Sequence, residues 1–264
     1  VVPNILHAQD NLIVADTKGN LRRLYGEHLE RNGYKVMHLD FTDVAETPWG
    51  YNPLSYVRKC QDAELNRNGD YYNEQDIKKL AQALCPWMNS KDPFWDQSAQ
   101  MYLEAIILFV MNLLPREQHN LYEVYTFLSK MGTEGLENII EEECATHPDS
   151  AFARKIGMIR QNTKAERMDA SIKGILAQHL DVVTYSGVKR MFRMKEQVDM
   201  NAFLKGKTAL FLSVSDSDRS QDALINLFYT QALQYLMAAA DQQQDSRLPI
   251  PVRFILDDFS TNTV

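Results

Sequence analysis

Four short apolar runs at the two ends of this 264-residue chain constrain its fold most strongly. They lie at 11–15, 34–39, 208–214 and 252–256, and each leads into a polar turn that carries an acidic residue. A continuous apolar run bounded by such a turn is typical of a buried parallel strand. Apolar residues at helical spacing follow the first and third runs, so the sequence predicts two βαβ units.

Between these two units the apolar pattern becomes helical. From Ser55 to Val198 the spacing predicts helices and no convincing strand. The simplest architecture is a parallel α/β sheet that is interrupted by a helical insertion. We therefore predict one discontinuous α/β domain formed by 1–54 and 200–264, and an inserted all-α domain at 55–199.

The last apolar run ends in two adjacent carboxylates, Asp257 and Asp258. This is the pattern of a Walker B strand, in which the first carboxylate holds Mg²⁺ and the next acidic residue polarises the attacking water. An open α/β sheet binds its ligand at the carboxyl ends of its strands. The alternative is that Asp257 simply ends a core strand and Asp258 faces the solvent. The pattern alone leaves both interpretations open.

Asp16 and Lys18 follow the first apolar run and are placed to face the same nucleotide cleft; a charged turn with a solvated Lys18 is the alternative. The chain contains no G-x-x-x-x-G-K-[ST] phosphate loop. Gly206 to Thr208 has the final Gly-Lys-Thr of that motif, but it precedes a strand where the motif should follow one. We expect this triplet to form only a turn.

Charge is unevenly distributed along the chain. The net charge is −7, yet the stretch 151–195 holds ten basic and three acidic residues. This stretch is compatible with phosphate contacts to nucleic acid, with a dock for an acidic partner, or with the solvated face of a helical bundle. The candidate surface residues are Arg154, Lys155, Arg160, Lys164, Arg167 and Lys173.

Six short motifs, taken in order, resemble the type IV secretion coupling proteins, the TraG-like and TraD-like ATPases of bacterial conjugation. They are VPNI at 2–5, VADTKG at 14–19, GYKV at 33–36, YNPL at 51–54, DPFW at 92–95 and RFILDD at 253–258. The resemblance covers essentially the whole chain. It implies a RecA-like P-loop NTPase domain interrupted by an all-α domain, as the apolar pattern predicts independently.

The resemblance also implies an activity and its partners. The family forms a homo-hexameric ring ATPase that uses ATP and Mg²⁺ to deliver relaxase-bound single-stranded DNA to a type IV secretion channel. Relaxosome accessory proteins and other secretion components are the further partners implied. The family is anchored in the plasma membrane by an N-terminal segment, and its phosphate loop lies just upstream of the segment similar to VPNI. We therefore expect a cytoplasmic fragment that begins after that loop and does not hydrolyse ATP by itself.

By this resemblance Asp257 takes the Mg²⁺-associated position and Asp258 a catalytic position that usually holds Glu. Thr17 and Asn20 replace the usual Pro and Glu of the turn that contains Asp16 and Lys18. Two alternatives to the conjugation ATPase remain. One is a non-enzymatic helical module that docks relaxase or accessory proteins, and the other is a related ring ATPase that pumps double-stranded DNA.

Overall fold

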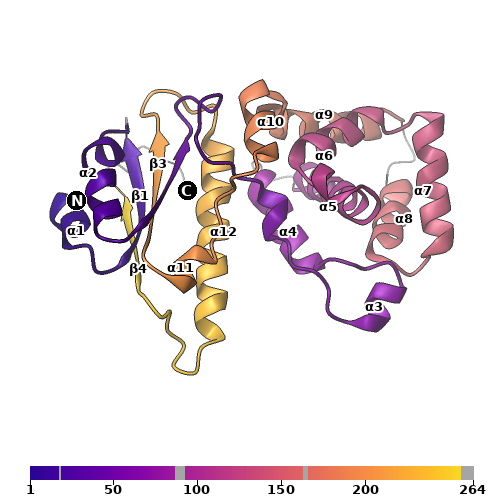
Figure 1. Ribbon diagram of the computed structural model, residues 1–264. Coiled ribbons are helices and arrows are strands. Elements are labelled where there is room, and N and C mark those ends of the chain that lie inside the picture. The colour runs from indigo at the N-terminus through magenta and orange to yellow at the C-terminus, as the bar shows by residue number, and fades with distance from the viewer. Residues whose placement is uncertain (18, 87–92, 163–165, 257–264) are drawn as a thin grey trace. The chain divides into compact units, whose positions relative to one another are not determined.

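The chain forms two compact units. The computed structural model describes residues 1–17, 19–86, 93–162 and 166–256. Residues 1–52 together with 186–264 form one unit, the sheet unit, and residues 53–185 form the other, the helical unit (Figure 1). The sheet unit is thus discontinuous in sequence, and the helical unit is inserted into it. The predicted α/β class is confirmed.

Four parallel strands form the sheet. They are β1 (Asn11–Thr17), β2 (Lys35–Asp40), β3 (Thr208–Val214) and β4 (Val252–Leu256), and they lie in the order β2-β3-β1-β4. The inner strands β1 and β3 are almost wholly buried, whereas β2 and β4 alternate between buried and exposed positions. Helices cover both faces, so the inner strands need apolar side chains on both sides and show continuous apolar runs.

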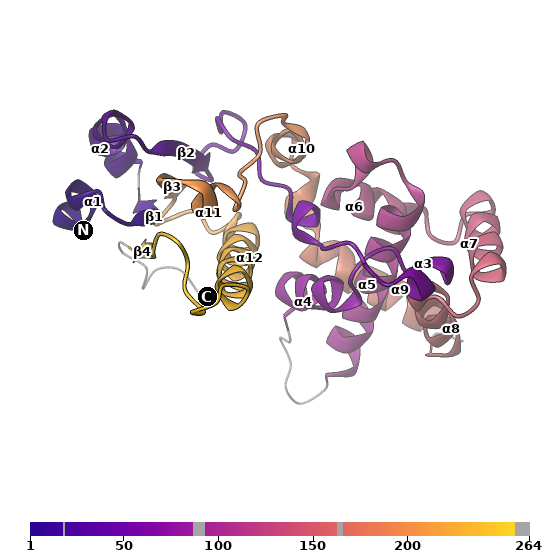
Figure 2. The ribbon, with the colours of Figure 1, turned by 60° about the horizontal axis from the view of Figure 1, so that its bottom comes forward.

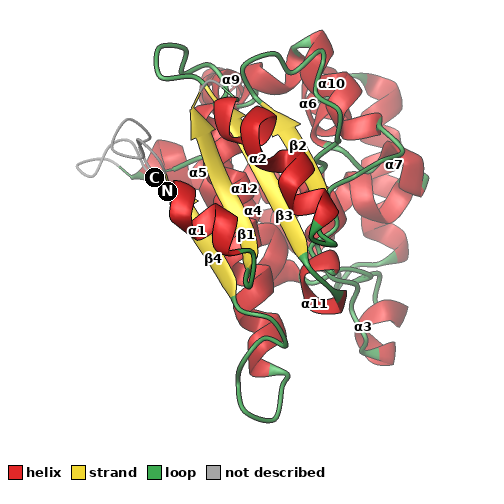
Figure 3. Ribbon diagram, turned by 60° about the vertical axis from the view of Figure 1, so that its left-hand side comes forward, coloured by secondary structure: helices red, strands yellow, loops and turns green. Residues whose placement is uncertain are grey.

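Helices lie on both faces of this sheet. The helices of the unit are α1 (Val2–His7), α2 (Asn20–Arg31), α10 (Ser186–Arg193), α11 (Ala202–Lys205) and α12 (Asp222–Asp241). Figure 3 shows α1 and α2 in front of the sheet and α12 behind it. Ile5, Leu29 and the strand residues Val14 and Phe211 form a buried cluster beneath α1 and α2. Gly33 follows α2 at φ 81°, a left-handed conformation that glycine adopts without steric cost.

The segment 186–199 belongs to the sheet unit, whereas the apolar pattern placed it in the helical domain. Gly187 of α10 lies so close to the loop after β2 that an added Cβ would sit 2.8 Å from the Ala45 amide nitrogen. Arg190 donates a hydrogen bond to the Ala45 carbonyl oxygen over 2.8 Å. Both contacts are made with the backbone of a loop that is distant in the sequence. The spacing of apolar side chains therefore does not predict that α10 belongs to the sheet unit.

The helical unit is built around one central helix. Its helices are η1 (Pro53–Tyr56), α3 (Ala63–Arg67), α4 (Glu74–Leu84), α5 (Phe94–Leu113), η2 (Arg116–Gln118), α6 (Leu121–Lys130), α7 (Glu134–Thr146), α8 (Ala151–Asn162), α9 (Glu166–His179) and η3 (Asp181–Thr184). Fourteen residues of α5 are buried, because α4, α6, α8 and α9 contact it on several sides (Figure 2). Among the described residues, no helix has the length and apolar character that crossing a membrane requires.

Candidate functional site

The carboxyl edge of the parallel sheet is the candidate site. The strand register places Asp16 of β1, Ser213 of β3 and Asp40 of β2 in one row across the sheet. On the other side of β1, the register pairs Ala15 with Leu256, the last described residue of β4. Asp257 and Asp258 follow Leu256 in the sequence and lie outside the described residues, as does Lys18. Open parallel sheets bind their ligands at this edge.

Asp16 is fully buried and its carboxylate begins α2. One oxygen accepts a hydrogen bond from the Leu21 amide over 2.9 Å, and the other accepts one from the Arg22 amide over 2.7 Å. Amides in the first turn of a helix have no partner inside the helix, so this carboxylate satisfies two of them. Burial raises the pKa of Asp16, and the bonds from the Arg22 and Leu21 amides oppose that rise. The side chain therefore holds the turn after β1, and both of its oxygens are occupied.

The turn after β1 lies against the side chain of Ser213. Gly19 in this turn has φ 68°, and an added Cβ would lie 3.2 Å from the Ser213 hydroxyl oxygen. That hydroxyl is 2.7 Å from Nε2 of His38 on β2. Burial lowers the pKa of His38, against the opposing effect of the nearby Asp40 carboxylate. Residues from three strands and one turn thus meet at the edge, and sequence reasoning missed His38 and Ser213 because each stands in an ordinary strand.

Asp40 organises the loop that follows β2. One carboxylate oxygen accepts hydrogen bonds from the Thr42 amide, the Thr42 hydroxyl and the Asp43 amide, over 2.9, 2.6 and 3.2 Å. The Asp40 amide donates to the Thr47 hydroxyl over 3.0 Å. Within the described part of the chain, no group of three or more His, Cys, Asp or Glu side chains is placed to hold a metal ion. The carboxylates of Asp16 and Asp40 are thus already engaged in shaping the two loops.

The Gly206–Thr208 triplet lies at the opposite end of the sheet. It connects α11 to the first residue of β3. The Lys207 ammonium donates to the Ala8 carbonyl oxygen over 3.2 Å and lies 5.4 Å from the ring centre of Tyr34. The triplet is a turn at the amino end of a strand, as the sequence context predicts.

Most of the candidate basic residues of the helical unit are engaged in ion pairs. The pairs are Arg154 with Glu74 (3.1 Å), Lys155 with Glu104 (2.5 Å), Arg160 with Glu137 (3.3 Å) and Lys173 with Asp169 (2.7 Å). Arg167 is exposed, and Lys164 lies outside the described residues. Three of these acids, Glu74, Glu104 and Glu137, lie on other helices, so a count of charges within 151–195 does not include them. Four of the five described candidates thus have an acidic partner within the helical unit.

Comparison with known proteins gives a consistent result. Residues 1–262 match the family described as "Type IV secretory system Conjugative DNA transfer". A comparison with curated protein sequences gives no significant match. Solved structures of the plasmid coupling protein TrwB are similar in fold. The complex with the ATP analogue ADPNP has 11% identity and a TM-score of 0.54, covering 97% of this chain and 58% of TrwB.

The complex of TrwB with ADP and Mg²⁺ has 12% identity and a TM-score of 0.53, and the match covers 95% of this chain and 57% of TrwB. At these identities the likeness is one of fold, and the chain spans less than three fifths of each of these two TrwB chains. The RecA-like α/β fold expected from the sequence is thereby confirmed. Because the family match covers almost the whole chain, the protein belongs to the type IV secretory system conjugative DNA transfer family.

Proposed function

We propose that this protein is the coupling ATPase of a conjugation system, which recruits a relaxase-bound DNA strand and drives it through a type IV secretion channel. One observation carries the proposal: in a chain of the conjugative DNA transfer family, β4 pairs with β1 up to Leu256 at the carboxyl edge of a parallel sheet, and the sequence continues from Leu256 with Asp257 and Asp258. The nucleotide complexes of TrwB support ATP and Mg²⁺ as the ligands.

The proposal assigns a role to each aspartate near this edge of the sheet. Asp16 and Asp40 already accept hydrogen bonds from two loops, and in this proposal Asp257, which follows β4 in the sequence, holds Mg²⁺. Mg²⁺ binds hard oxygen ligands and neutralises charge on phosphate oxygens, which fits an aspartate at this edge. Asp258 orients the attacking water, and Lys18 faces the nucleotide. Asp16 acts indirectly, because it fixes the turn between β1 and α2.

Binding of the ATP phosphates requires a further element, the phosphate loop. None of the 264 residues forms a G-x-x-x-x-G-K-[ST] loop, so the ATPase takes its phosphate loop from outside this sequence. In the proposed machine the sheet unit is the motor, and it works as a homo-hexamer on the cytoplasmic side of an anchored complex. The helical unit receives the relaxase, accessory proteins or other secretion components.

A DNA-transfer assay tests this function. Donor cells whose conjugation depends on this protein would carry wild type, Asp258→Asn or the control Asp245→Asn, in which an exposed carboxylate of the loop between α12 and β4 is altered in the same way. We expect Asp258→Asn to lower transfer frequency by at least about a hundredfold at unchanged protein level, because the attacking water loses its base. Normal transfer by Asp258→Asn would rule out the proposed role.

A further inference from the structure

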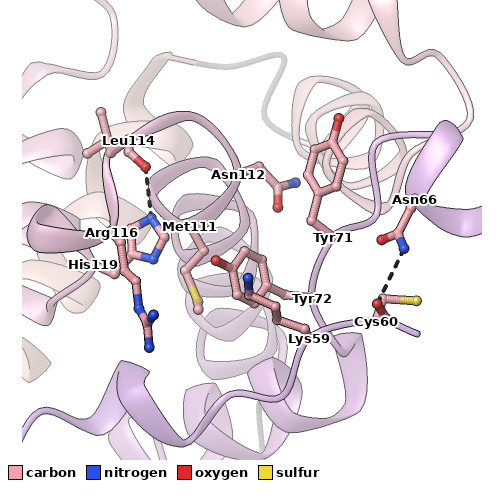
Figure 4. Close-up of a pocket in the computed structure, with 10 residues that line it drawn as sticks. All are labelled: Lys59, Cys60, Asn66, Tyr71, Tyr72, Met111, Asn112, Leu114, Arg116 and His119. Carbon is pink, nitrogen blue, oxygen red and sulfur yellow. Dashed lines mark hydrogen bonds between the residues drawn. The ribbon is translucent and has the colours of Figure 1, made fainter. Parts of the chain in front are cut away.

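The helical unit contains a cavity of about 570 Å³ between the carboxyl end of α5 and the loop that precedes α4 (Figure 4). Its walls include two cations, two tyrosines, a methionine and an asparagine, namely Lys59, Arg116, Tyr71, Tyr72, Met111 and Asn112. No described residue that lines it is acidic. Its volume lies within the range of small-molecule sites, which is roughly 300–1,000 Å³.

A short backbone ladder holds one wall of this cavity. The Cys60 amide donates to the Tyr71 carbonyl oxygen and the Asn73 amide donates to the Arg58 carbonyl oxygen, each over 2.9 Å. Lys59 and Tyr72 therefore oppose each other as an antiparallel pair without direct hydrogen bonds between them. In such a pair both side chains project from the same face and lie close together. The ladder thus presents Lys59 and Tyr72 to the cavity together.

The end of α5 supplies the opposite wall. His119 donates through Nε2 to the Leu114 carbonyl oxygen over 2.8 Å, which closes the turn that contains Arg116. The rings of Tyr72 and His119 meet edge to face, with centres 5.9 Å apart. Burial raises the pKa of Tyr72, and the charge of Arg116 opposes that rise, so Arg116 lies within electrostatic reach of the tyrosine. Figure 4 shows Lys59 and Arg116 on either side of Met111.

The two cations of this cavity have no acidic partner among the described residues. Neither Lys59 nor Arg116 forms an ion pair with any described residue, in contrast to the paired cations of α8 and α9. The Asn112 side-chain nitrogen donates to the Gly69 carbonyl oxygen over 3.0 Å, while its buried side-chain oxygen has no hydrogen-bond partner among the described residues. A complementary ligand carries negative charge and a flat apolar body.

We infer that this cavity binds a nucleotide, with the phosphate between Lys59 and Arg116 and the base against Tyr71 and Tyr72. A nucleotide supplies both features, because every base has a π-face and is joined to a phosphate. An acidic peptide supplies carboxylates but no flat ring in fixed relation to them. A free nucleotide and one nucleotide of a single strand share this chemistry. The site uses residues of the helical unit alone, so it stands independently of the ATPase proposed for the sheet unit.

Binding of a labelled oligothymidylate and of thymidine monophosphate to the whole chain tests the inference. The site variant is Lys59→Gln with Arg116→Gln, and the matched control is Lys79→Gln with Lys130→Gln, which removes the same charge from exposed positions of the same unit. We expect the site variant to bind at least about tenfold more weakly and the control within about twofold of wild type. For the oligonucleotide, the slope of log K against log salt should flatten by about 0.7 for each phosphate that the site variant no longer neutralises.

A third variant separates stacking from charge. Tyr71 is 39% exposed, so Tyr71→Ala leaves the core intact, and it should weaken binding about tenfold with the cations unchanged. Thermal unfolding of every variant shows whether the fold is kept.

Equal affinity for the monophosphate and the oligonucleotide identifies a free-nucleotide site, and preference for the oligonucleotide identifies a strand site. Absence of binding by wild type, equal weakening in the control, or competition by polyglutamate as strong as by the oligonucleotide would overturn the inference.

Discussion

Replacement of Asp16 by alanine should destabilise the sheet unit by about 2–4 kcal/mol. The side chain is 0% exposed, and its two oxygens accept hydrogen bonds from the Leu21 and Arg22 amides. Loss of a helix-capping side chain costs about 1 kcal/mol, and each buried amide left without a partner costs about 1–3 kcal/mol, which relaxation of the turn partly offsets. Asp16→Asn keeps one acceptor oxygen, so its cost should be about half as large.

Hydrogen exchange at the start of α2 is the direct assay for this change. In wild type the Leu21 and Arg22 amides should be protected, and in Asp16→Ala the free energy of local opening at these two positions should fall by the same 2–4 kcal/mol. Asp43→Ala, which removes an exposed carboxylate from the loop after β2, is the matched control and should leave exchange unchanged. Unchanged protection in Asp16→Ala, together with loss of nucleotide binding, would show that Asp16 is a ligand and would refute its structural role.

Three further perturbations test other parts of the structure. Burial holds the pKa of His38 below its ordinary value of 6.5, so as pH falls the unfolded chain takes up a proton before the folded chain does. The free energy of unfolding should therefore fall as pH drops below about 6.5, and His38→Gln should reduce this dependence in urea titrations from pH 7.5 to 5. Lys155→Met should lower the free energy of unfolding by about 2–4 kcal/mol because it leaves the largely buried Glu104 carboxylate without its cation. Adding Glu104→Gln should restore more than half of that loss in the same urea titration. Gly187→Ala should destabilise by about 1–3 kcal/mol through its backbone clash, whereas Gly174→Ala, with open space around it in α9, should stabilise by about 0.5–1 kcal/mol in thermal unfolding.

The sequence predicts the strands well because a buried strand is a continuous apolar run of neighbouring residues. A strand covered on both faces must be apolar throughout, as 208–214 is, and a polar turn must follow where the chain leaves the sheet. The sequence also predicts α5, because a helix that is buried on most sides carries apolar residues at helical spacing around most of its surface. The βαβ pattern and its helical interruption follow from these local signals.

Long-range polar contacts are what the sequence does not predict. The assignment of α10 depends on Gly187 and Arg190 meeting the loop at Ala45, more than a hundred residues earlier. The link between His38 and Ser213 depends on strand order, which the sequence pattern leaves open. The ion pairs of Arg154, Lys155 and Arg160 and the cavity at Lys59 likewise join segments that are distant in sequence. These contacts require the tertiary arrangement before they can be seen.

Mg²⁺-dependent ATP hydrolysis tests most directly the claim that the carboxyl edge of this sheet is a nucleotide site. The assay compares the 264-residue chain alone with a longer protein in which a phosphate-loop segment precedes it, each as wild type, Asp257→Asn and the control Asp245→Asn. We predict turnover only in the longer protein, a loss of at least about a hundredfold in Asp257→Asn, and normal activity in the control. Full activity of Asp257→Asn, or turnover by the chain alone, would contradict the account.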